Sequence, residues 1–348
     1  MRIDIGISGD RLLVIAFAFM ATLALAGTAS RQTAASFTGT TVNPANNVAT
    51  MLVQVPASQN NAASAAAGVV TLSWTATPTA PGAGHTLTYN VLRGPVGGPY
   101  SLIGNTAALA FNDTPPSDGT YQYVIQAKVT GGGTFTSGNS AAKNGVSDRV
   151  APAMSITCNS AACGAGWYNA AVSVTVSGVD GGTGMGSVTR NVDATGQTST
   201  AGASATFNVT GQSAGHTVAY FGVDAAGNAS STSNQTVKID LTAPTVATAL
   251  ASATGLGGVP ITVDLTWTAG TDALSGLQGY EVRWTDNVAA CPAASSTNYP
   301  NSATVGAVTA YSLASPVSGD KHCAYLVTID NAGNRSAASA VTGPTKSK

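Results

Sequence analysis

The pentapeptide pattern Asp-x-Ala-Gly-Asn occurs twice in the chain, each time directly after an alternating apolar stretch. Asp224 opens the first copy (224–228) and Asp330 opens the second (330–334). Gly and Asn tolerate the positive φ angles that close a hairpin, and an Asp side chain accepts the amides of a turn. The pattern therefore predicts repeated hairpins in tandem all-β domains. No stretch beyond the N-terminal region has helical periodicity.

The N-terminus has the features of an export signal. Arg2 and Arg11 precede a nearly unbroken apolar run at 12–26, and small residues follow it. A run of about 15 residues suits a signal helix and is short for a membrane span. We therefore expect a signal peptide over 1–29, with an uncleaved membrane anchor as the alternative. An Ala/Thr/Asn-rich segment follows at 30–49, and the mature protein is expected to be secreted or held on the cell surface.

Alternating strands and Pro-containing linkers divide the rest of the chain. Asp148 and Asp240 each begin a linker that ends in Ala-Pro, at 148–152 and 240–244. Proline after a strand stops ladder pairing and stiffens the connection. We expect domains at 50–147, 150–241 and 245–343, the first beginning with a strand at 50–55.

The first and third domains resemble fibronectin type III domains. The resemblance rests on Trp74 in the second strand, Tyr89-x-Val in the third, and the series Tyr121, Tyr123, Ile125 and Ala127 in the sixth. It implies a β-sandwich in which the Tyr121 hydroxyl bonds nearby backbone. The third domain repeats the pattern with Trp267 and Tyr280. It has Cys323 where the corner tyrosine is expected, so a disulfide would replace that contact.

The middle domain resembles bacterial immunoglobulin-like repeats of surface proteins. The residues that carry this likeness are Trp-Tyr-Asn at 167–169, the strand 172–176, the Gly-rich turn after Asp180, and the pattern at 224–228. The segment around 35–50, with Phe-Thr-x-Thr after a signal, is similar to the N-terminal region of camelysin- and TasA-type exported bacterial proteins. Together these resemblances imply three tandem sandwiches on a bacterial surface.

The four cysteines fit an exported protein. We pair Cys158 with Cys163 and Cys291 with Cys323, because the two other connectivities would tie separate domains together. The separation of the second pair, and the lack of a histidine near the first, argue against a zinc site.

The composition points away from several functions. Only 8% of the residues are charged and the net charge is −1. The chain therefore lacks the basic surface that would attract nucleic acid or anionic lipid. Membrane contact is expected only through the N-terminal segment, if it is uncleaved. The three histidines fall in different domains, and no nucleophile motif or facing acid pair is present. Glu281 is interpreted as a surface ion-pair partner of Arg283. We expect no catalytic residues and no enzyme activity.

Two kinds of binding site are nevertheless considered. Asp148, Asp240, Asp224 and Asp330 lie at domain ends or hairpin tips, where oxygen ligands could hold calcium. The alternative is that these side chains only accept turn amides. Trp167, Tyr168, Trp284 and Tyr299 are candidates for stacking on a glycan, although each could instead be a core residue.

The expected function is a structural or adhesive module that presents binding faces to cell-wall glycan, matrix or another surface protein. A carbohydrate-binding accessory to polysaccharide degradation is the alternative. We expect no cofactor, with calcium as the alternative.

Overall fold

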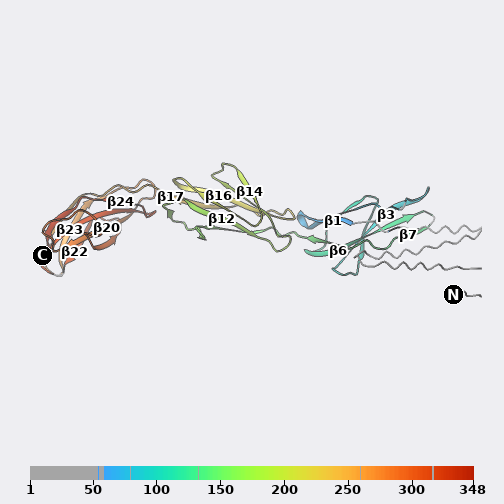
Figure 1. Cartoon of the computed structure of the whole chain (residues 1–348), viewed down its shortest axis with the longest axis horizontal. Helices are drawn as coiled ribbons and strands as arrows, with labels where there is room; N and C mark the ends of the chain where they lie inside the picture. Colours follow the sequence, from blue (N-terminus) through green and yellow to red (C-terminus); the bar gives the residue numbers. More distant parts are fainter. Residues whose placement is uncertain (1–53, 55–58, 79, 132, 259, 316) are drawn as a thin grey trace, which may run out of the picture. The chain divides into compact units, whose positions relative to one another are not determined.

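The computed structural model describes residues 54, 59–78, 80–131, 133–258, 260–315 and 317–348. This part of the chain is almost entirely β, and its only helix is the 3-10 turn η1 (Ala66–Gly68). Figure 1 shows strand arrows throughout the coloured chain. The described residues contain no helix that could cross a bilayer. The expected signal peptide, the segment 30–49 and nearly all of the strand expected at 50–55 lie outside the described residues.

The first two sheets pack face to face. The smaller has the order β1-β2-β5, and the larger has the order β4-β3-β6-β7, with β8 also paired to β6. Trp74 of β2 and Tyr89 of β3 meet edge to face across the interior, with ring centroids 5.6 Å apart. The Tyr121 hydroxyl donates to the Ser117 carbonyl at 3.0 Å, so the tyrosine corner that the sequence predicts is present. The strands are β1 (Gln59–Ala65), β2 (Val69–Trp74), β3 (Thr86–Gly94), β4 (Ser101–Thr106), β5 (Ala110–Asp113), β6 (Gly119–Thr130), β7 (Thr134–Thr136) and β8 (Lys143–Ser147).

The middle pair of sheets repeats this arrangement. One sheet has the order β10-β9-β12-β15 and the other β11-β17-β16-β13-β14, with β11 parallel to β17. Strand β12 alternates strictly, so Val172, Val174 and Val176 are fully buried against valines of the opposite sheet. The strands are β9 (Ala153–Cys158), β10 (Ala161–Ala162), β11 (Trp167–Tyr168), β12 (Val172–Val179), β13 (Met185–Val192), β14 (Gln197–Ala201), β15 (Ser204–Val209), β16 (Ser213–Asp224) and β17 (Ser233–Ile239).

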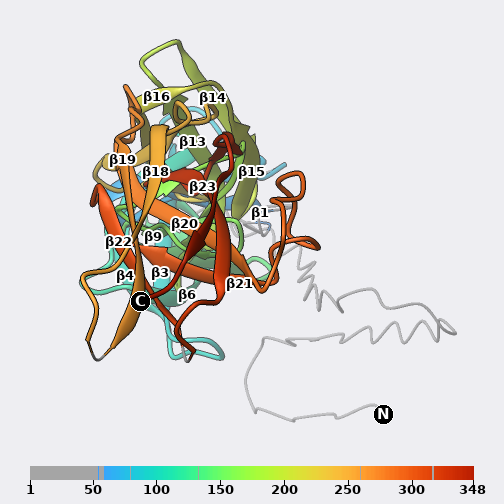
Figure 2. The ribbon, with the colours of Figure 1, turned by 90° about the vertical axis from the view of Figure 1, so that its left-hand side faces the viewer.

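The last pair of sheets has the orders β18-β19-β22 and β21-β20-β23-β24, with β25 also paired to β23. Figure 2 shows β18 and β19 side by side, as their antiparallel register requires. Trp267 of β19 and Tyr280 of β20 meet edge to face at 5.2 Å, as Trp74 and Tyr89 do in the first pair. The strands are β18 (Thr248–Thr254), β19 (Ile261–Thr268), β20 (Leu277–Asp286), β21 (Asn301–Val305), β22 (Ala310–Ser315), β23 (Lys321–Asp330), β24 (Arg335–Ala338) and β25 (Thr342–Lys346).

The fold class is therefore all-β, with packed sheets, as the sequence predicts. Both disulfides link the cysteines that were paired from the sequence, Cys158 with Cys163 and Cys291 with Cys323. The domain boundaries at 50–147, 150–241 and 245–343 stay a prediction.

Candidate functional site: aspartate clusters at the two linkers

The first linker places the carboxylate of Asp148 in a buried position. Asp148 is 1% exposed. Its Oδ1 accepts the Val150 amide at 3.1 Å, and its Oδ2 accepts both the amide of Thr183 at 2.7 Å and its hydroxyl at 2.8 Å. Thr183 belongs to the Gly-rich turn between β12 and β13. The linker is thus anchored in a loop of the sheet pair that follows it.

The turn at 224–228 completes this anchor. Asp224, 3% exposed, accepts the amides of Gly227 and Asn228 at 2.6 and 2.7 Å. The Asn228 side-chain amide donates to Asp224 Oδ2 at 2.7 Å and to the Asp148 carbonyl at 3.0 Å. Gly227 has a φ of 98°, which favours glycine at this place in the turn. The Asx hydrogen bonds that the sequence predicts for this motif are therefore present, and one asparagine also binds the linker.

Asp180 brings a third carboxylate to the same place. Its Oδ2 accepts the amides of Gly182 and Gly184 at 3.1 and 2.8 Å. Its Oδ1 is buried and has no hydrogen-bond partner. One oxygen each of Asp148, Asp180 and Asp224 lies within 4.8 Å of the others.

The second linker is built in the same way. Asp240 is 0% exposed and accepts the amides of Thr242 and Ser275, each at 3.0 Å. Asp330, also 0% exposed, accepts the amides of Ala332 and Asn334 at 2.9 and 2.8 Å. The Asn334 side-chain amide donates to Asp330 Oδ2 and to the Asp240 carbonyl, both at 2.8 Å. In both linkers the aspartate carboxylate thus accepts an amide of the loop that follows, and the asparagine of the Asp-x-Ala-Gly-Asn turn binds the linker carbonyl.

Asp272 takes the place that Asp180 has in the first cluster. Its Oδ2 accepts the amides of Leu274 and Gly276 at 3.1 and 2.7 Å. One oxygen each of Asp240, Asp272 and Asp330 again lies within 4.8 Å of the others. The four aspartates predicted from the sequence therefore divide into two separate groups, and each group gains a third member.

Sequence reasoning missed Asp180 and Asp272 as members of the clusters. A signal for both was present. Each lies 32 positions after the linker aspartate (180 − 148 and 272 − 240), and each opens the pattern Asp-x-x-Thr/Ser-Gly. The hydroxyl residue of that pattern is Thr183 or Ser275, the residue that binds the linker carboxylate.

The linker carboxylates are held in the charged form. Burial raises the pKa of Asp148, but hydrogen bonds from Thr183 and Val150 outweigh it and bring the pKa below its usual range. Burial likewise raises the pKa of Asp240, and hydrogen bonds from Thr242 and Ser275 outweigh it and bring the pKa below its usual range. At the cluster separation, each like-charge pair repels by on the order of 3 kcal/mol at an effective dielectric of about 20. No Lys or Arg ion pair to these six aspartates is found in the described part of the chain.

The clusters suit a hard cation. Carboxylate, backbone and amide oxygens are the ligands that Ca²⁺ takes in proteins. Asp180 Oδ1 is the observation that favours a ligand, because a buried acceptor without a donor is costly unless something else satisfies it. Asp148, Asp180 and Asp224 would supply carboxylates to such an ion in the first cluster, and Asp240, Asp272 and Asp330 in the second.

The predicted glycan-stacking residues lie mostly in the interior. Tyr299 is fully buried and packs edge to face on Tyr325, so it offers no ring face to a sugar and the prediction is wrong for it. Tyr168 and Trp284 pack against the cores of their sheet pairs. Trp167 is half-buried, with the Lys238 ammonium 6.0 Å from its ring centroid.

The predicted ion pair between Glu281 and Arg283 is present, but the expected surface position of Glu281 is wrong. Glu281 is 9% exposed, and its carboxylate pairs with Arg283 at 2.7 Å and with Arg335. Strand alternation predicted an outward side chain correctly. The two arginines cover it, and the sequence pattern does not show that cover.

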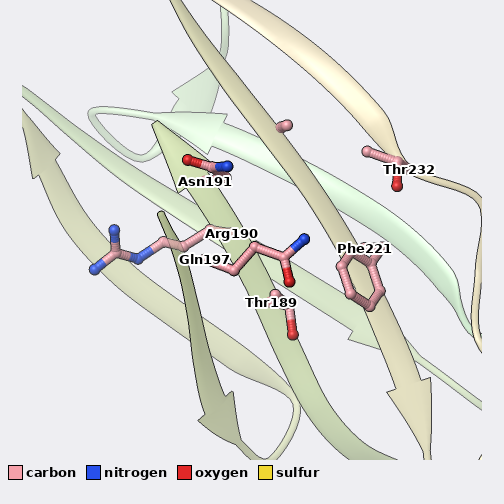
Figure 3. Close-up of a pocket in the computed structure, with 7 residues that line it drawn as sticks. Thr189, Arg190, Asn191, Gln197, Phe221 and Thr232 are labelled. Atoms are coloured by element: carbon pink, nitrogen blue, oxygen red, sulfur yellow. The ribbon is translucent and has the colours of Figure 1, made fainter. Parts of the chain in front are cut away.

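A shallow pocket lies on the outer face of the middle five-stranded sheet. Figure 3 shows Thr189 and Asn191 on β13, Gln197 on β14 and Phe221 on β16 around it. Its volume is about 60 Å³, room for about two waters. The pocket is therefore too small for a sugar ring.

No protein-family model matches the chain, and no curated protein matches it in sequence. Among solved structures, the FN1–FN3 domains of chicken CNTN1 have 11% identity and a TM-score of 0.35, with 83% of this chain and 97% of that chain covered. Domains A168-A170 of titin have 13% identity and a TM-score of 0.38, with 82% and 97% covered. Likeness of this degree carries no argument about function, and the architecture rests on the sheets and cores described above.

Proposed function

We propose that the chain is a non-catalytic structural or adhesive protein of the bacterial cell surface or extracellular space, presenting binding faces on tandem β-sandwiches. The repeated anchoring of a linker carboxylate supports this role. Asp148 and Asp240 each bind the loops of the following sheet pair through equivalent contacts. A spacer of sandwich modules needs such defined joints, because flexible linkers leave neighbouring modules free to reorient.

The proposal treats each pair of sheets as a domain. Strand pairing is confined to 59–147, 153–239 and 248–346 among the described residues. Each pair carries its own buried residues, which supports the expected boundaries at 50–147, 150–241 and 245–343. The two disulfides fit an oxidising compartment, which supports export.

A pull-down with the exported chain tests this function. We expect the chain to be retained on cell-wall glycan, on a matrix protein or on intact bacterial envelopes. We expect no bond in the bound glycan or protein to be cleaved. Reducing-sugar and amine assays on the same samples check for bond cleavage. Turnover of any glycan or protein would contradict a non-catalytic role.

Carbohydrate binding is the alternative, and Trp167 is the residue that favours it. Trp167 is the one predicted stacking residue outside the core clusters, and the nearby Lys238 ammonium has N–H groups that could donate to a sugar hydroxyl. Trp167→Ala should abolish glycan retention if this alternative holds and leave protein partners unaffected. Equal glycan retention by Trp167→Ala and the wild type would exclude Trp167 as the platform.

We also propose that the two aspartate clusters bind calcium and so stiffen the joints. Titration calorimetry on the exported chain should show two sites with dissociation constants of about 10⁻⁴–10⁻³ M, the range of extracellular modules. Asp180→Asn and Asp272→Asn should each remove one site. Asp264→Asn, a surface change on β19, serves as the control. No heat of binding at millimolar calcium would refute the metal role. The aspartates would then stiffen the joints through their hydrogen bonds alone.

A further inference from the structure

The two linkers differ in their second residue, which is Arg149 in the first and Leu241 in the second. These two positions are equivalent in the fold. In each case the last residue of the strand before the linker, β8 or β17, pairs with the first residue of a long strand, β6 or β16. The residue just before that long strand is Asp118 in the first sheet pair and Gln212 in the middle one. The pair Arg149 and Asp118 therefore corresponds in position to the pair Leu241 and Gln212.

Arg149 clamps the first linker to the sheet pair that precedes it. Its Nη1 donates to Asp118 Oδ1 at 2.7 Å and to Ser147 Oγ at 3.0 Å, and its Nη2 donates to the Pro115 carbonyl. Gly68 leaves the space for this side chain, because a Cβ at that position would lie 2.5 Å from Arg149 Cζ. The planar guanidinium therefore binds several acceptors of the first sheet pair at once, which a neutral side chain at this position does not do.

A hydrogen bond also joins the first two sheet pairs directly at this joint. The Ala67 amide, in η1 of the first pair, donates to Asn228 Oδ1, in the turn after β16, at 2.9 Å. The same asparagine donates its Nδ2 to the Asp148 carbonyl of the linker at 3.0 Å. The linker, the sheet pair before it and the sheet pair after it are thus all bound to one another.

The second joint has neither feature. Gln212 Oε1 accepts the Leu241 amide at 3.3 Å and the Thr242 hydroxyl at 2.7 Å, and the Tyr168 carbonyl accepts the Asp240 amide at 2.9 Å. These groups of the middle sheet pair are all neutral. The Leu241 side chain has no role in them, and the residue is 49% exposed. In the described part of the chain, no hydrogen bond links the middle and last sheet pairs directly.

Contacts with the sheet pair that follows do not explain this difference. Each aspartate cluster joins its linker to the following sheet pair in the same way. The second linker also exchanges two hydrogen bonds with Thr271, because the Thr245 amide donates to the Thr271 carbonyl at 2.8 Å and the Thr271 amide donates to Thr245 Oγ1 at 2.6 Å. The two joints therefore differ on the side of the preceding sheet pair.

Neighbouring domains move relative to each other unless their contacts prevent it, and a few linker residues are enough to form a hinge. We infer that the chain has one fixed joint and one hinge: the Arg149 clamp holds the first joint, and the chain bends at 240–242, where the clamp is missing. This inference rests on the proposed spacer function and states which of the two joints lets a binding face reorient.

Double electron–electron resonance on the full exported chain tests the inference, because it measures the width of the distance distribution between two spin labels. Labels at Thr134→Cys and Thr200→Cys span the first joint, and labels at Thr200→Cys and Ala253→Cys span the second. All three residues are exposed on strands. In EDTA, which keeps the aspartate clusters free of calcium, we expect the distribution across the second joint to be at least twice as wide as that across the first.

Exchanging the clamp between the joints provides the matched variants. Arg149→Leu gives the first linker the residue of the second and should about double the width across the first joint. Leu241→Arg combined with Gln212→Asp builds the clamp at the second joint and should about halve the width there. Arg190→Leu removes an arginine that stacks on Phe207 inside the middle sheet pair, and should change neither width.

Three results would overturn the inference: equally narrow distributions across both joints, a first joint unchanged by Arg149→Leu, or a second joint not narrowed in the double variant. Each would leave the pull-down and the calcium titration as they are. Equally wide distributions across both joints, in calcium as well as in EDTA, would also contradict the defined joints of the proposed spacer. The two kinds of failure are therefore distinguishable.

Discussion

At the scale of single residues, aspartate and asparagine side chains take the place of regular backbone pairing in the loops. Asp224 and Asp330 each accept two turn amides, and Asn228 and Asn334 each join such a turn to a linker carbonyl. Buried backbone groups need partners, so each side chain satisfies donors that the loop cannot satisfy itself.

The tyrosine corner gives a prediction for one hydroxyl group. Tyr121→Phe removes the hydrogen bond from Tyr121 to the Ser117 carbonyl and leaves the ring in place. We expect a loss of about 1 kcal/mol in the unfolding free energy of the first sheet pair, the usual net value of such a bond. Urea unfolding of the variant and the wild type measures it. Tyr311→Phe, which removes a hydroxyl with no described hydrogen bond, should be neutral. A Tyr121→Phe variant as stable as the wild type would contradict the role of the corner.

The pair His216–Asp193 predicts a pH dependence of stability. Burial lowers the pKa of His216, but hydrogen bonds to the Asp193 carboxylate and the Gly211 carbonyl outweigh it, so the net pKa is raised. The hydrogen bond from His216 is also the main cause that lowers the pKa of Asp193. A raised histidine pKa gives stability that is complete below about pH 6.5 and lost as the pH rises through the folded value. A lowered carboxyl pKa gives stability that is present above about pH 4 and lost as the pH falls through its folded value.

Unfolding of wild type and His216→Asn at two pH values checks this pair. Because the Asp193 side chain is 41% exposed, we expect the stability difference to be no more than about 1 kcal/mol. That difference should be larger at pH 5.5 than at pH 9. A difference independent of pH would show that His216 acts through packing alone.

At the scale of elements, a disulfide holds a long connection on the outer face of the last sheet. The segment between β20 and β21 carries Cys291 and Tyr299, and covers Cys323 and Tyr325 of β23. The Tyr299 hydroxyl also donates to the Pro292 carbonyl at 2.9 Å, which closes this segment on itself. A second apolar cluster thus forms on a face that would otherwise meet solvent.

The two disulfides should differ in their contribution to stability. The Cys291–Cys323 bridge spans 32 residues, and the Cys158–Cys163 bridge spans 5. Loop-closure entropy predicts about 3–4 kcal/mol for the first and about 2 kcal/mol for the second. Double serine variants of each pair, compared by urea unfolding, measure both values. A larger loss of unfolding free energy on removing the Cys158–Cys163 bridge would mean that loop-closure entropy is not the main source of the stabilisation.

At the scale of the whole chain, the linkers decide how sheet pairs are joined. The Asp148 carbonyl accepts the Gly68 amide at 2.9 Å and the Asn228 side-chain amide at 3.0 Å, so residues of both neighbouring sheet pairs bind it. The Asn228 Oδ1 also accepts the Ala67 amide at 2.9 Å. One linker residue and one turn residue therefore bind both sides of the first joint.

Trypsin provides a local test of this joint, because Arg149 lies inside the linker. Asp148→Ala removes three accepted hydrogen bonds. Leaving their donors without partners costs about 1–3 kcal/mol, so we expect cleavage after Arg149 to become about tenfold or more faster. Mass spectrometry of timed digests measures the rate, and Asp264→Ala is the surface control. An unchanged rate would show that the carboxylate does not hold the linker closed.

Much of the architecture follows from sequence patterns alone. Period-two alternation identifies β2, β12, β19 and most of β23, because local residue order dictates which face of the strand a side chain takes. The expectations for Glu281 and Tyr299 are wrong because residues of other strands cover them. Arg335 of β24 covers Glu281, and Tyr299 packs on Tyr325 of β23. β1 was not expected, because an Ala/Asn-rich stretch has no alternation to reveal it.

By itself, the sequence determined the all-β class, the cysteine pairs and the turn chemistry of the Asp-x-Ala-Gly-Asn motifs. The class and the turns depend on residues close in the chain, and four cysteines allow only three pairings. Only the tertiary structure decided that Asp148 meets Asp180 and Asp224, and that Asp240 meets Asp272 and Asp330. Contacts between loops of different strands depend on how two sheets pack, and no local pattern records that packing.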